Sequence, residues 1–147
     1  MDRDRAAGLA GTWAQRHAEG EEPSPLVVEG VERALAERVP EPAQAAAAVP
    51  GADGKPLVAV LAAHALWTIW TVGAAGTPDA VRCRRVPLDP ATTSVEVSER
   101  LEGEQRVRHW WFEVGEDPLV FRTVGDDDAA EHFARALATA LGWPAGL

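Results

Sequence analysis

The 147-residue chain contains no tyrosine and no asparagine, only one lysine (Lys55) and only one cysteine (Cys83). A single cysteine excludes an internal disulfide and fits a reducing compartment, so we expect a cytoplasmic protein. The preference for arginine over lysine and the lack of asparagine are typical of a GC-rich, bacterial genome and carry no chemical information. The first residues, MDRDRAAGLAGTW, include charges but no apolar segment, so we also expect no signal peptide.

Motifs that would identify a reaction are missing as well. The sequence has no GxSxG, HExxH, CxxC or GxGxxG pattern, and GADGK at 51–55 lacks the spacing of a phosphate-binding loop. The four histidines fall in four different expected elements, with no pair at metal-binding spacing. Cys83 is interpreted as a small core residue, because on a strand Arg82 and Arg84 would point to the other face. We therefore expect no catalytic residue, no metal and no cofactor.

Charge and composition narrow the class of partner. The net charge of −9 is spread along the chain, so nucleic acid and anionic lipid are repelled on average. A hydrophobic fraction of 46% and a charged fraction of 25% are ordinary for a soluble globular protein. A chain of this length is expected to form a single domain, residues 1–147, around one core.

One long apolar run has to be explained. Residues 57–75, LVAVLAAHALWTIWTVGAA, carry no ionisable side chain other than His64 and reach the length of a membrane span. The central histidine, Trp67 and Thr68 near the middle, and the lack of a flanking basic cluster argue against a span. Its many β-branched residues favour two strands separated at AAHA. A single buried helix over 57–72 and a membrane-associated segment are the alternatives.

The first third of the chain is expected to be helical. Apolar side chains recur at intervals of three and four in residues 3–17, which predicts one amphipathic helix. Ser24 is a good N-cap and Pro25 suits a first helical position, so a second helix is predicted up to residue 39. Residues 1–39 thus form an N-terminal helical segment. The Pro-, Ala- and Gly-rich residues 40–56 are interpreted as a linker with at most one short helical turn.

From residue 57 the pattern changes to strands with short turns between them. Two strands are predicted within 57–72, and further strands at 80–87, 93–101, 106–114 and 119–124. Six consecutive strands joined by short turns predict an antiparallel meander. Residues 57–147 are therefore expected to hold this meander and the last helix.

The last helix has the clearest signals. Asp128 and Glu131 have the spacing of a capping box, and an apolar face then repeats through the segment 127–142. The residues GWP at 142–144 end the helix, with the tryptophan placed to fold back on the last turn.

This order resembles that of a pleckstrin-homology-like domain, in which antiparallel strands form a bent barrel closed by a C-terminal helix. The resemblance is one of layout and covers about ninety residues, 57–147. Members that bind phosphoinositides keep basic residues around the first hairpin, whereas LVAVLAAHALW has none. The family's usual tryptophan within the last helix is replaced by Phe133, with Trp143 beyond the end. The resemblance therefore implies protein docking rather than lipid binding. A rival layout is the helix-plus-curved-sheet fold of small ligand-binding proteins and cyclases.

The stretch RHWWFEV at 108–114 supplies the main candidate site residues. Neighbouring residues of a strand point to opposite faces, so Trp110 and Trp111 cannot share one apolar face, and the same holds for Trp67 and Trp70. Arg106 and Arg108 share the face of Trp110 and would form an anion site or a docking surface. The alternative, which we favour, is cross-strand pairing of these arginines with Glu96, Glu104 and Glu113. His109 is expected to be a partly buried sheet residue. The candidate binding residues are Trp110, Arg106, Arg108, Trp67, Trp70, Trp111, His109 and His64.

The sequence thus predicts an α+β domain with two N-terminal helices, a six-stranded mainly antiparallel sheet or bent barrel, and a C-terminal amphipathic helix. The function that we favour is a non-enzymatic, acidic protein-interaction module, such as an adaptor, a chaperone or an inhibitor-type partner. The alternative is a small-molecule-binding or catalytic pocket protein lined by tryptophan and histidine. A protein partner is expected, with neither nucleic acid nor membrane, and the oligomeric state is left open.

Overall fold

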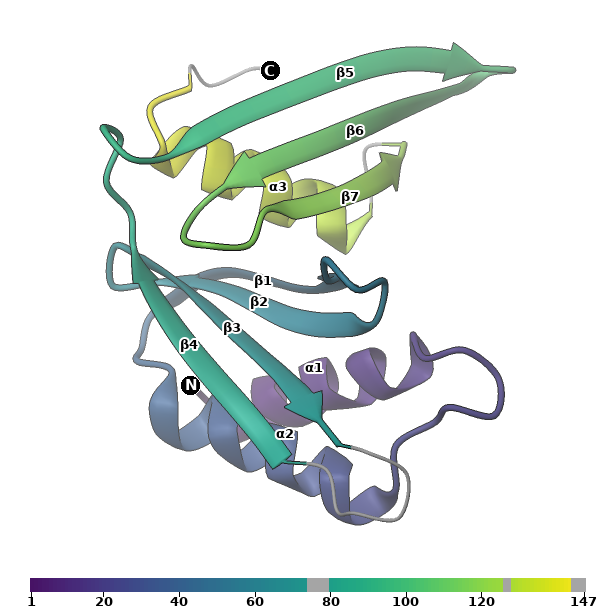
Figure 1. The fold of residues 1–147 in the computed structure, drawn as a ribbon, viewed down its shortest axis with the longest axis vertical. Helices are drawn as coiled ribbons and strands as arrows, with labels where there is room; N and C mark the ends of the chain where they lie inside the picture. The colour runs from purple at the N-terminus through teal and green to yellow at the C-terminus, as the bar shows by residue number, and fades with distance from the viewer. Residues whose placement is uncertain (74–79, 126–127, 144–147) are drawn as a thin grey trace.

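A computed structural model describes residues 1–73, 80–125 and 128–143, which form three helices and two antiparallel sheets (Figure 1). The predicted α+β class is therefore confirmed. In chain order the elements are α1 (Arg3–Gln15), α2 (Pro25–Arg38), β1 (Ala43–Pro50), β2 (Pro56–Ala62), β3 (Ala65–Val72), β4 (Ala80–Pro87), β5 (Ser94–Glu102), β6 (Gln105–Glu113), β7 (Leu119–Val124) and α3 (Ala129–Ala140).

The strands form two sheets instead of the single sheet or barrel that the sequence predicts. One sheet has the order β1-β2-β3-β4 and the other β5-β6-β7, with every neighbouring pair antiparallel. Within the described residues no strand pairing joins the two sheets, so they do not close into a barrel. The chain passes from one sheet to the other at LDPATT, residues 88–93, between β4 and β5.

The strand that the sequence does not predict is β1, which lies within residues 40–56, where a linker is expected. Its sequence AQAAAAVP has neither strand propensity nor alternation, because alanine is a poor strand former. Tertiary packing explains the strand instead. Ala47 contacts the core on the α3 side and Ala48 contacts the core on the α1 side, so both faces of β1 are covered. Small side chains allow helices to lie close against both faces of the strand, which overrides the local preference.

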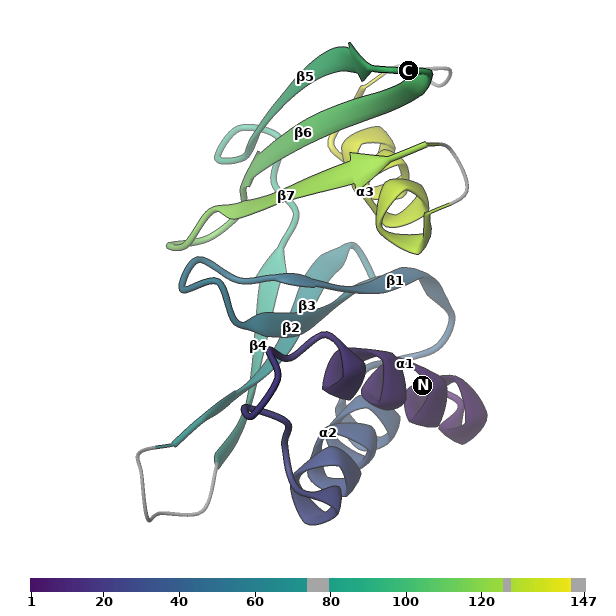
Figure 2. The ribbon, with the colours of Figure 1, turned by 90° about the vertical axis from the view of Figure 1, so that its right-hand side faces the viewer.

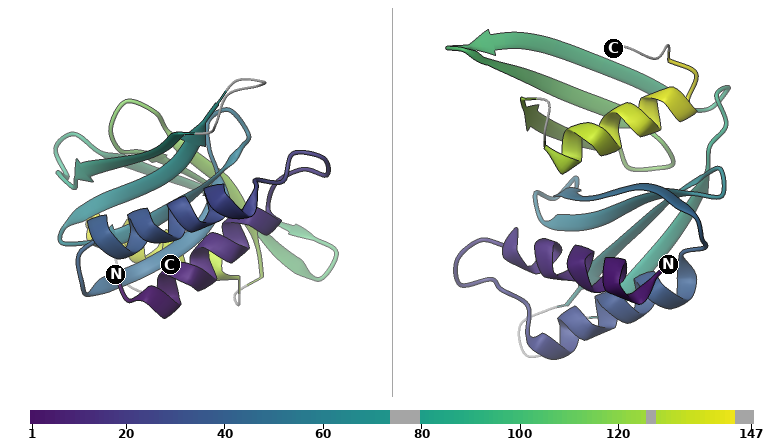
Figure 3. Two further views of the ribbon diagram at one scale, coloured as in Figure 1. Left: turned by 90° about the horizontal axis from the view of Figure 1, so that it is seen from below. Right: turned by 180° about the vertical axis from the view of Figure 1, so that it is seen from behind.

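The molecule is layered (Figures 1 and 2). The helices α1 and α2 cover one face of the four-stranded sheet, and α3 together with the three-stranded sheet covers the other. Seen from below, α1 and α2 run across the four-stranded sheet, and seen from behind, α3 lies between the two sheets (Figure 3). There α3 packs against β1. Two buried clusters result, one on each face of the four-stranded sheet. In β2 and the first part of β3 both faces are therefore apolar, which explains the uninterrupted hydrophobic run there.

The two N-terminal helices agree with the sequence prediction. Asp2 caps α1, and Ser24 caps α2 with Pro25 at its first position. The apolar stripe of α1 buries Trp13 completely, and its indole N–H donates to the carbonyl oxygen of Pro56 at 2.9 Å. The stripe of α2 buries Leu35.

Residues 57–72 form the hairpin of β2 and β3, as predicted, so the alternative of one long helix is wrong. The chain reverses at Ala63 and His64, whose φ angles are +51° and +55°. Within the described parts of the chain, no helix combines the length and the hydropathy that a membrane crossing requires. Residues 74–75 of the apolar run lie outside the described residues.

The C-terminal helix is confirmed, but its predicted capping box is only half correct. Asp128 accepts a hydrogen bond from the backbone N–H of Ala130 at 3.0 Å, as an N-cap should. Glu131 does not return to the cap and is instead buried in the interior. At the other end the Trp143 N–H donates to the Ala138 carbonyl at 3.0 Å, which confirms the predicted fold-back. The expected contributions of residues 126–127 and 144 lie outside the described residues.

Candidate ligand-binding groove between the two sheets

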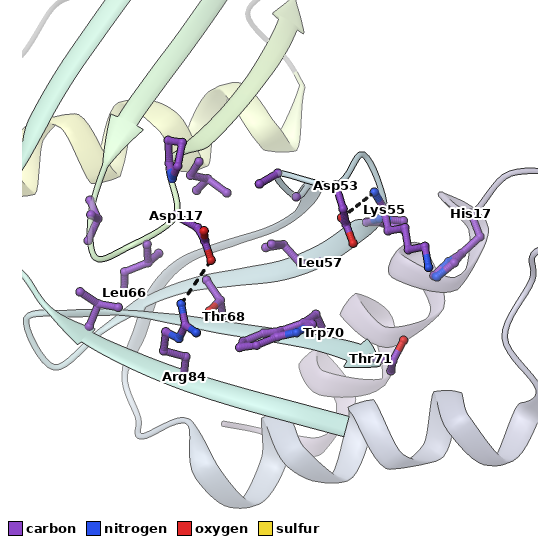
Figure 4. A pocket seen from close by; sticks show the side chains of 17 residues that line it. His17, Asp53, Lys55, Leu57, Leu66, Thr68, Trp70, Thr71, Arg84 and Asp117 are labelled. Atoms are coloured by element: carbon purple, nitrogen blue, oxygen red, sulfur yellow. Dashed lines mark hydrogen bonds and ion pairs between the residues drawn. The ribbon is translucent and has the colours of Figure 1, made fainter. Parts of the chain in front are cut away.

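The three-stranded sheet and α3 leave part of β3 and β4 uncovered, and a groove of about 350 Å³ lies there. We call it the inter-sheet groove (Figure 4). Its floor is formed by the inner faces of β3 and β4, and its walls by the β1–β2 turn and the β6–β7 turn. The floor and wall residues used below are Leu66, Thr68, Trp70, Arg84, Val86, Asp53, Lys55, Asp117 and Leu119.

Strand periodicity determines which side chains reach the groove floor. Leu66, Thr68 and Trp70 alternate along β3 and therefore share one face. The register of the hairpin places Arg84 of β4 opposite Thr68 and Val86 opposite Leu66. The floor thus changes from apolar at the buried Leu66 end to aromatic and cationic at Trp70 and Arg84.

Arg84 is the best-positioned charged group of the groove. Its guanidinium carbon lies 5.3 Å from the centre of the Trp70 ring, a cation–π distance. Its Nη1 lies 3.6 Å from Oδ2 of Asp117, which projects from the β6–β7 turn. The Arg84 and Asp117 side chains are 42% and 72% exposed, so this ion pair contributes little to stability.

The opposite end of the groove is formed by the β1–β2 turn and the end of α1. The turn is held by a hydrogen bond of 2.7 Å from the Gly51 N–H to the Lys55 carbonyl, and the Lys55 N–H donates to Asp53 Oδ1 at 3.0 Å. The Lys55 ammonium group and the His17 ring lie beside each other there, with Trp70 between them and Arg84 (Figure 4). Arg84 and Lys55 thus lie on the two sides of Trp70, while the Leu66 end of the floor is apolar.

Of the predicted binding residues, only Trp70 lies in the groove. Trp67 points to the opposite face of the sheet, as predicted, where it is half-buried against the helices. Its indole N–H donates to the Ala62 carbonyl at 3.1 Å, and Arg85 stacks on the ring at 5.8 Å. His64 is exposed in the β2–β3 turn.

Trp110 and Arg108 are interior residues and do not form an exposed docking surface. Trp110 is 1% exposed, and its indole N–H donates to Thr123 Oγ1 at 3.1 Å and to Glu131 Oε2 at 3.2 Å. Arg108 forms a buried ion pair with Glu131. Arg106 remains exposed on the same face. The helix α3 covers this part of the three-stranded sheet, and the sequence alone does not indicate which face it covers.

The predicted cross-strand pairing of the two arginines is correct in kind but involves a different acid. Arg106 Nε lies 2.6 Å from Oε1 of Glu99, and Arg108 Nη2 lies 3.6 Å from the same oxygen. The acid that both arginines reach on the neighbouring strand is thus Glu99 of β5, and Arg108 pairs with Glu131 as well.

Trp111 and His109 lie on the outer face of the three-stranded sheet. Trp111 is 42% exposed beside Val120, its partner on β7, and both line a shallow hollow of about 190 Å³ with His109. His109 is exposed, so the expectation of partial burial is wrong. This face thus exposes His109, Trp111 and Val120, and the Trp111 indole N–H donates to Glu113 Oε1 at 3.3 Å.

The sequence did not predict that Trp70 has Arg84, Lys55, Asp117 and His17 around it in one groove. They come from four separate segments that meet only when the sheet folds over α1 and under the β6–β7 turn. The one local signal is that Trp70 and Arg84 each alternate with other residues of their strands that face the groove.

Compared with protein-family models, with curated proteins and with solved structures, the chain matches none.

Proposed function

We propose that this protein is a non-enzymatic binding module that accepts an apolar segment of a protein partner in the inter-sheet groove, with a carboxylate of that segment on Arg84. The observation that carries the proposal is the Trp70–Arg84 stack, which is held in place by the sheet yet half-exposed at the groove floor.

The stack favours carboxylate binding because its geometry is already set. A guanidinium group held against an indole loses little conformational entropy when it binds, and its planar fork matches a carboxylate. Its present partner, Asp117, is largely exposed and 3.6 Å away, so a ligand carboxylate can replace it at little cost. Apolar ligand groups would be buried against Leu66, Val86 and Leu119.

We also propose that β1–β7 and α3 follow a pleckstrin-homology-like layout, with α1 and α2 as an additional layer. What supports it is the sequence of four antiparallel strands, three antiparallel strands and a final helix against the sheets. Of the two roles of such domains, lipid binding and protein docking, we propose docking. The groove carries acids as well as bases and the chain has a net charge of −9, which disfavours an anionic lipid headgroup.

Site-specific photo-crosslinking in the native host would test the proposal. Benzoylphenylalanine at Thr68 would lie in the groove, and the same residue at the exposed Glu29 of α2 serves as the matched control. We expect one protein to be captured from position 68 only, and Arg84→Glu in the same chain to abolish that capture. Capture that is equal at both positions, or insensitive to Arg84→Glu, would overturn the proposal.

A second candidate is a small aromatic carboxylate in the same groove. The volume of about 350 Å³ favours it, since small-molecule pockets begin near this size. The probe pair would be 3-phenylpropionate and its uncharged amide, followed by NMR shifts of the Trp70 indole. A small-molecule ligand would be favoured if the acid binds and Arg84→Gln abolishes that binding. In that case no protein should be crosslinked from position 68.

A further inference from the structure

The strand β5 has one edge without a partner strand. Within the described chain it pairs only with β6, along all nine of its residues. The β5–β6 hairpin also projects past the end of β7 and α3 (Figures 1 and 3). A long strand edge with unpaired N–H and C=O groups is a template for a further strand. The question is therefore which strand this edge fits.

The hairpin geometry identifies the backbone groups at the free edge. Glu102 pairs with Gln105 around a two-residue turn that begins at Gly103, whose φ is +66°. In such a hairpin the residues at the turn exchange hydrogen bonds with each other, and every second residue along the strand does the same. The intervening residues direct their N–H and C=O groups away from β6. On β5 these are Val95, Val97, Glu99 and Leu101.

The sequence of β5, SVEVSERLE, is complementary to itself when it runs antiparallel about Ser98. Glu96 then lies opposite Arg100 of a second copy, and by symmetry the pair occurs twice. Val95 lies opposite Leu101, the most exposed strand residue among the large apolar side chains at 74%. In this register the residues with outward backbone groups face each other across the edge, as an antiparallel ladder requires.

Neighbouring symmetric registers are worse. Moving the second copy by one step toward the turn places Glu99 opposite its own copy and Glu96 opposite Glu102, which are repulsive pairs. Moving it one step the other way leaves Arg100 opposite Ser94 and removes the ion pair. The present partner of Arg100 is Glu102, two residues away on the same strand, and both side chains are about half-exposed. Such a pair is weak and can be exchanged for Glu96 of a second copy.

We propose that two copies of this chain associate through antiparallel pairing of their β5 strands, with Ser98 opposite Ser98 and Glu96 opposite Arg100. The two three-stranded sheets become one six-stranded sheet. The inter-sheet groove lies on other strands and stays open in both copies, so the association is independent of the proposed ligand.

Charge exchange tests the pairing. Sedimentation velocity of the full chain between about 10 and 200 µM is expected to show a monomer–dimer equilibrium. Glu96→Arg and Arg100→Glu each place like charges opposite each other, and each should weaken the dimer by about tenfold or more. The double variant restores opposite charges and should return the dissociation constant to within about threefold of the wild-type value. Glu29→Arg, the same charge change on exposed α2, should leave it unchanged.

Disulfide trapping tests the register. In a Cys83→Ser background, Ser98→Cys places two thiols directly opposite each other, and mild oxidation should give a covalent dimer. Ser94→Cys, on the same face of the same strand, lies opposite Glu102 and should not be trapped. A chain that stays monomeric at the highest concentration would overturn the proposal. So would a dimer that ignores the charge variants, or trapping that is equal at positions 94 and 98.

Discussion

Arg108 of β6 and Glu131 of α3 form an ion pair in the interior, where both side chains are almost completely buried. Thr123, Arg135 and the indole of Trp110 also donate hydrogen bonds to the same carboxylate. Every oxygen lone pair of that carboxylate therefore has a donor nearby, which is the condition for a buried charge. This network attaches α3 to the three-stranded sheet and fixes which face of the sheet it covers.

Glu131→Gln is expected to lower the free energy of unfolding by about 3 kcal/mol, measured by urea denaturation, because it leaves Arg108 buried without its charged partner. The value lies at the low end for buried pairs, since Glu99 is 3.6 Å from Arg108 Nη2. Glu104→Gln in the exposed β5–β6 turn is the matched control and should change stability by less than about 0.5 kcal/mol.

Replacing both partners separates the ion pair from the packing. Arg108→Met combined with Glu131→Leu should be more stable than either single variant, because no unpaired charge remains buried. Trp110 keeps Thr123 as a hydrogen-bond acceptor in this double variant. Additive losses in the double variant would contradict a coupled network.

The carboxyl of Glu131 should titrate below its usual range. Burial alone would raise its pKa, but the hydrogen bonds from Thr123, Arg135, Arg108 and Trp110 outweigh burial and lower it. A depressed pKa means that the unfolded chain takes up the proton first as the pH falls. This contribution to stability is therefore fully present above about pH 5 and is lost below the unfolded pKa of about 4.3, as the pH falls through the folded pKa. A ¹³C NMR titration of the side-chain carboxyl checks it, and a midpoint at or above the unfolded value would contradict the prediction.

The adjacent tryptophans should differ sharply in their effect on stability. Trp110→Ala removes a buried indole that stacks on Phe112 at 5.7 Å, and should cost about 3–5 kcal/mol. Trp111→Ala removes a partly exposed one and should cost about 1 kcal/mol or less. Urea denaturation followed by circular dichroism measures both, and each variant is the control for the other. Equal losses would show that the outer face is covered in solution.

The β2–β3 turn can be improved. Ala63 and His64 both have positive φ angles, the conformation of a type I′ turn, which strains residues with a side chain. Ala63→Asn with His64→Gly is expected to raise the free energy of unfolding by about 1–2 kcal/mol. The reverse choice, valine at both positions, should destabilise the hairpin. A loss of stability with Asn-Gly would show that His64 makes a contact that matters.

Cys83 should react slowly with thiol reagents. Burial raises the pKa of its thiol, and the nearby charge of Arg38 lowers it by a smaller amount. The thiolate fraction at neutral pH is therefore smaller than in a free cysteine, and the rate of modification should rise only at higher pH. Arg38→Gln should raise the pKa further and slow the reaction. Labelling at the rate of free glutathione would contradict the prediction.

Much of the secondary structure follows from local patterns. The caps at Ser24 and Asp128, the break at Ala63 and the fold-back of Trp143 are each determined by a few neighbouring residues. The strand β1 could not be predicted in this way, because its alanines are selected for their small size between two layers. Glu131 has the sequence spacing of a capping residue. Its side chain lies in the interior because it pairs with Arg108 of β6, across the contact between α3 and the three-stranded sheet.

The candidate site was less predictable than the fold. Trp70 was singled out, but Arg84, Lys55 and Asp117 become its neighbours only through the register of β3 and β4 and the position of two turns. The cluster of Trp110 with Arg106 and Arg108 was placed correctly on one face. That face, however, is mostly covered by α3.

By itself, the sequence determined which residues share a face, since alternation along a strand and periodicity along a helix are local geometry. It thereby required that Trp110 and Trp111, and Trp67 and Trp70, point to opposite sides. Only the tertiary structure decided which faces of each sheet are buried. Burial depends on which layer packs over a face, and that choice is made by contacts between residues far apart in the chain, such as Arg108 with Glu131.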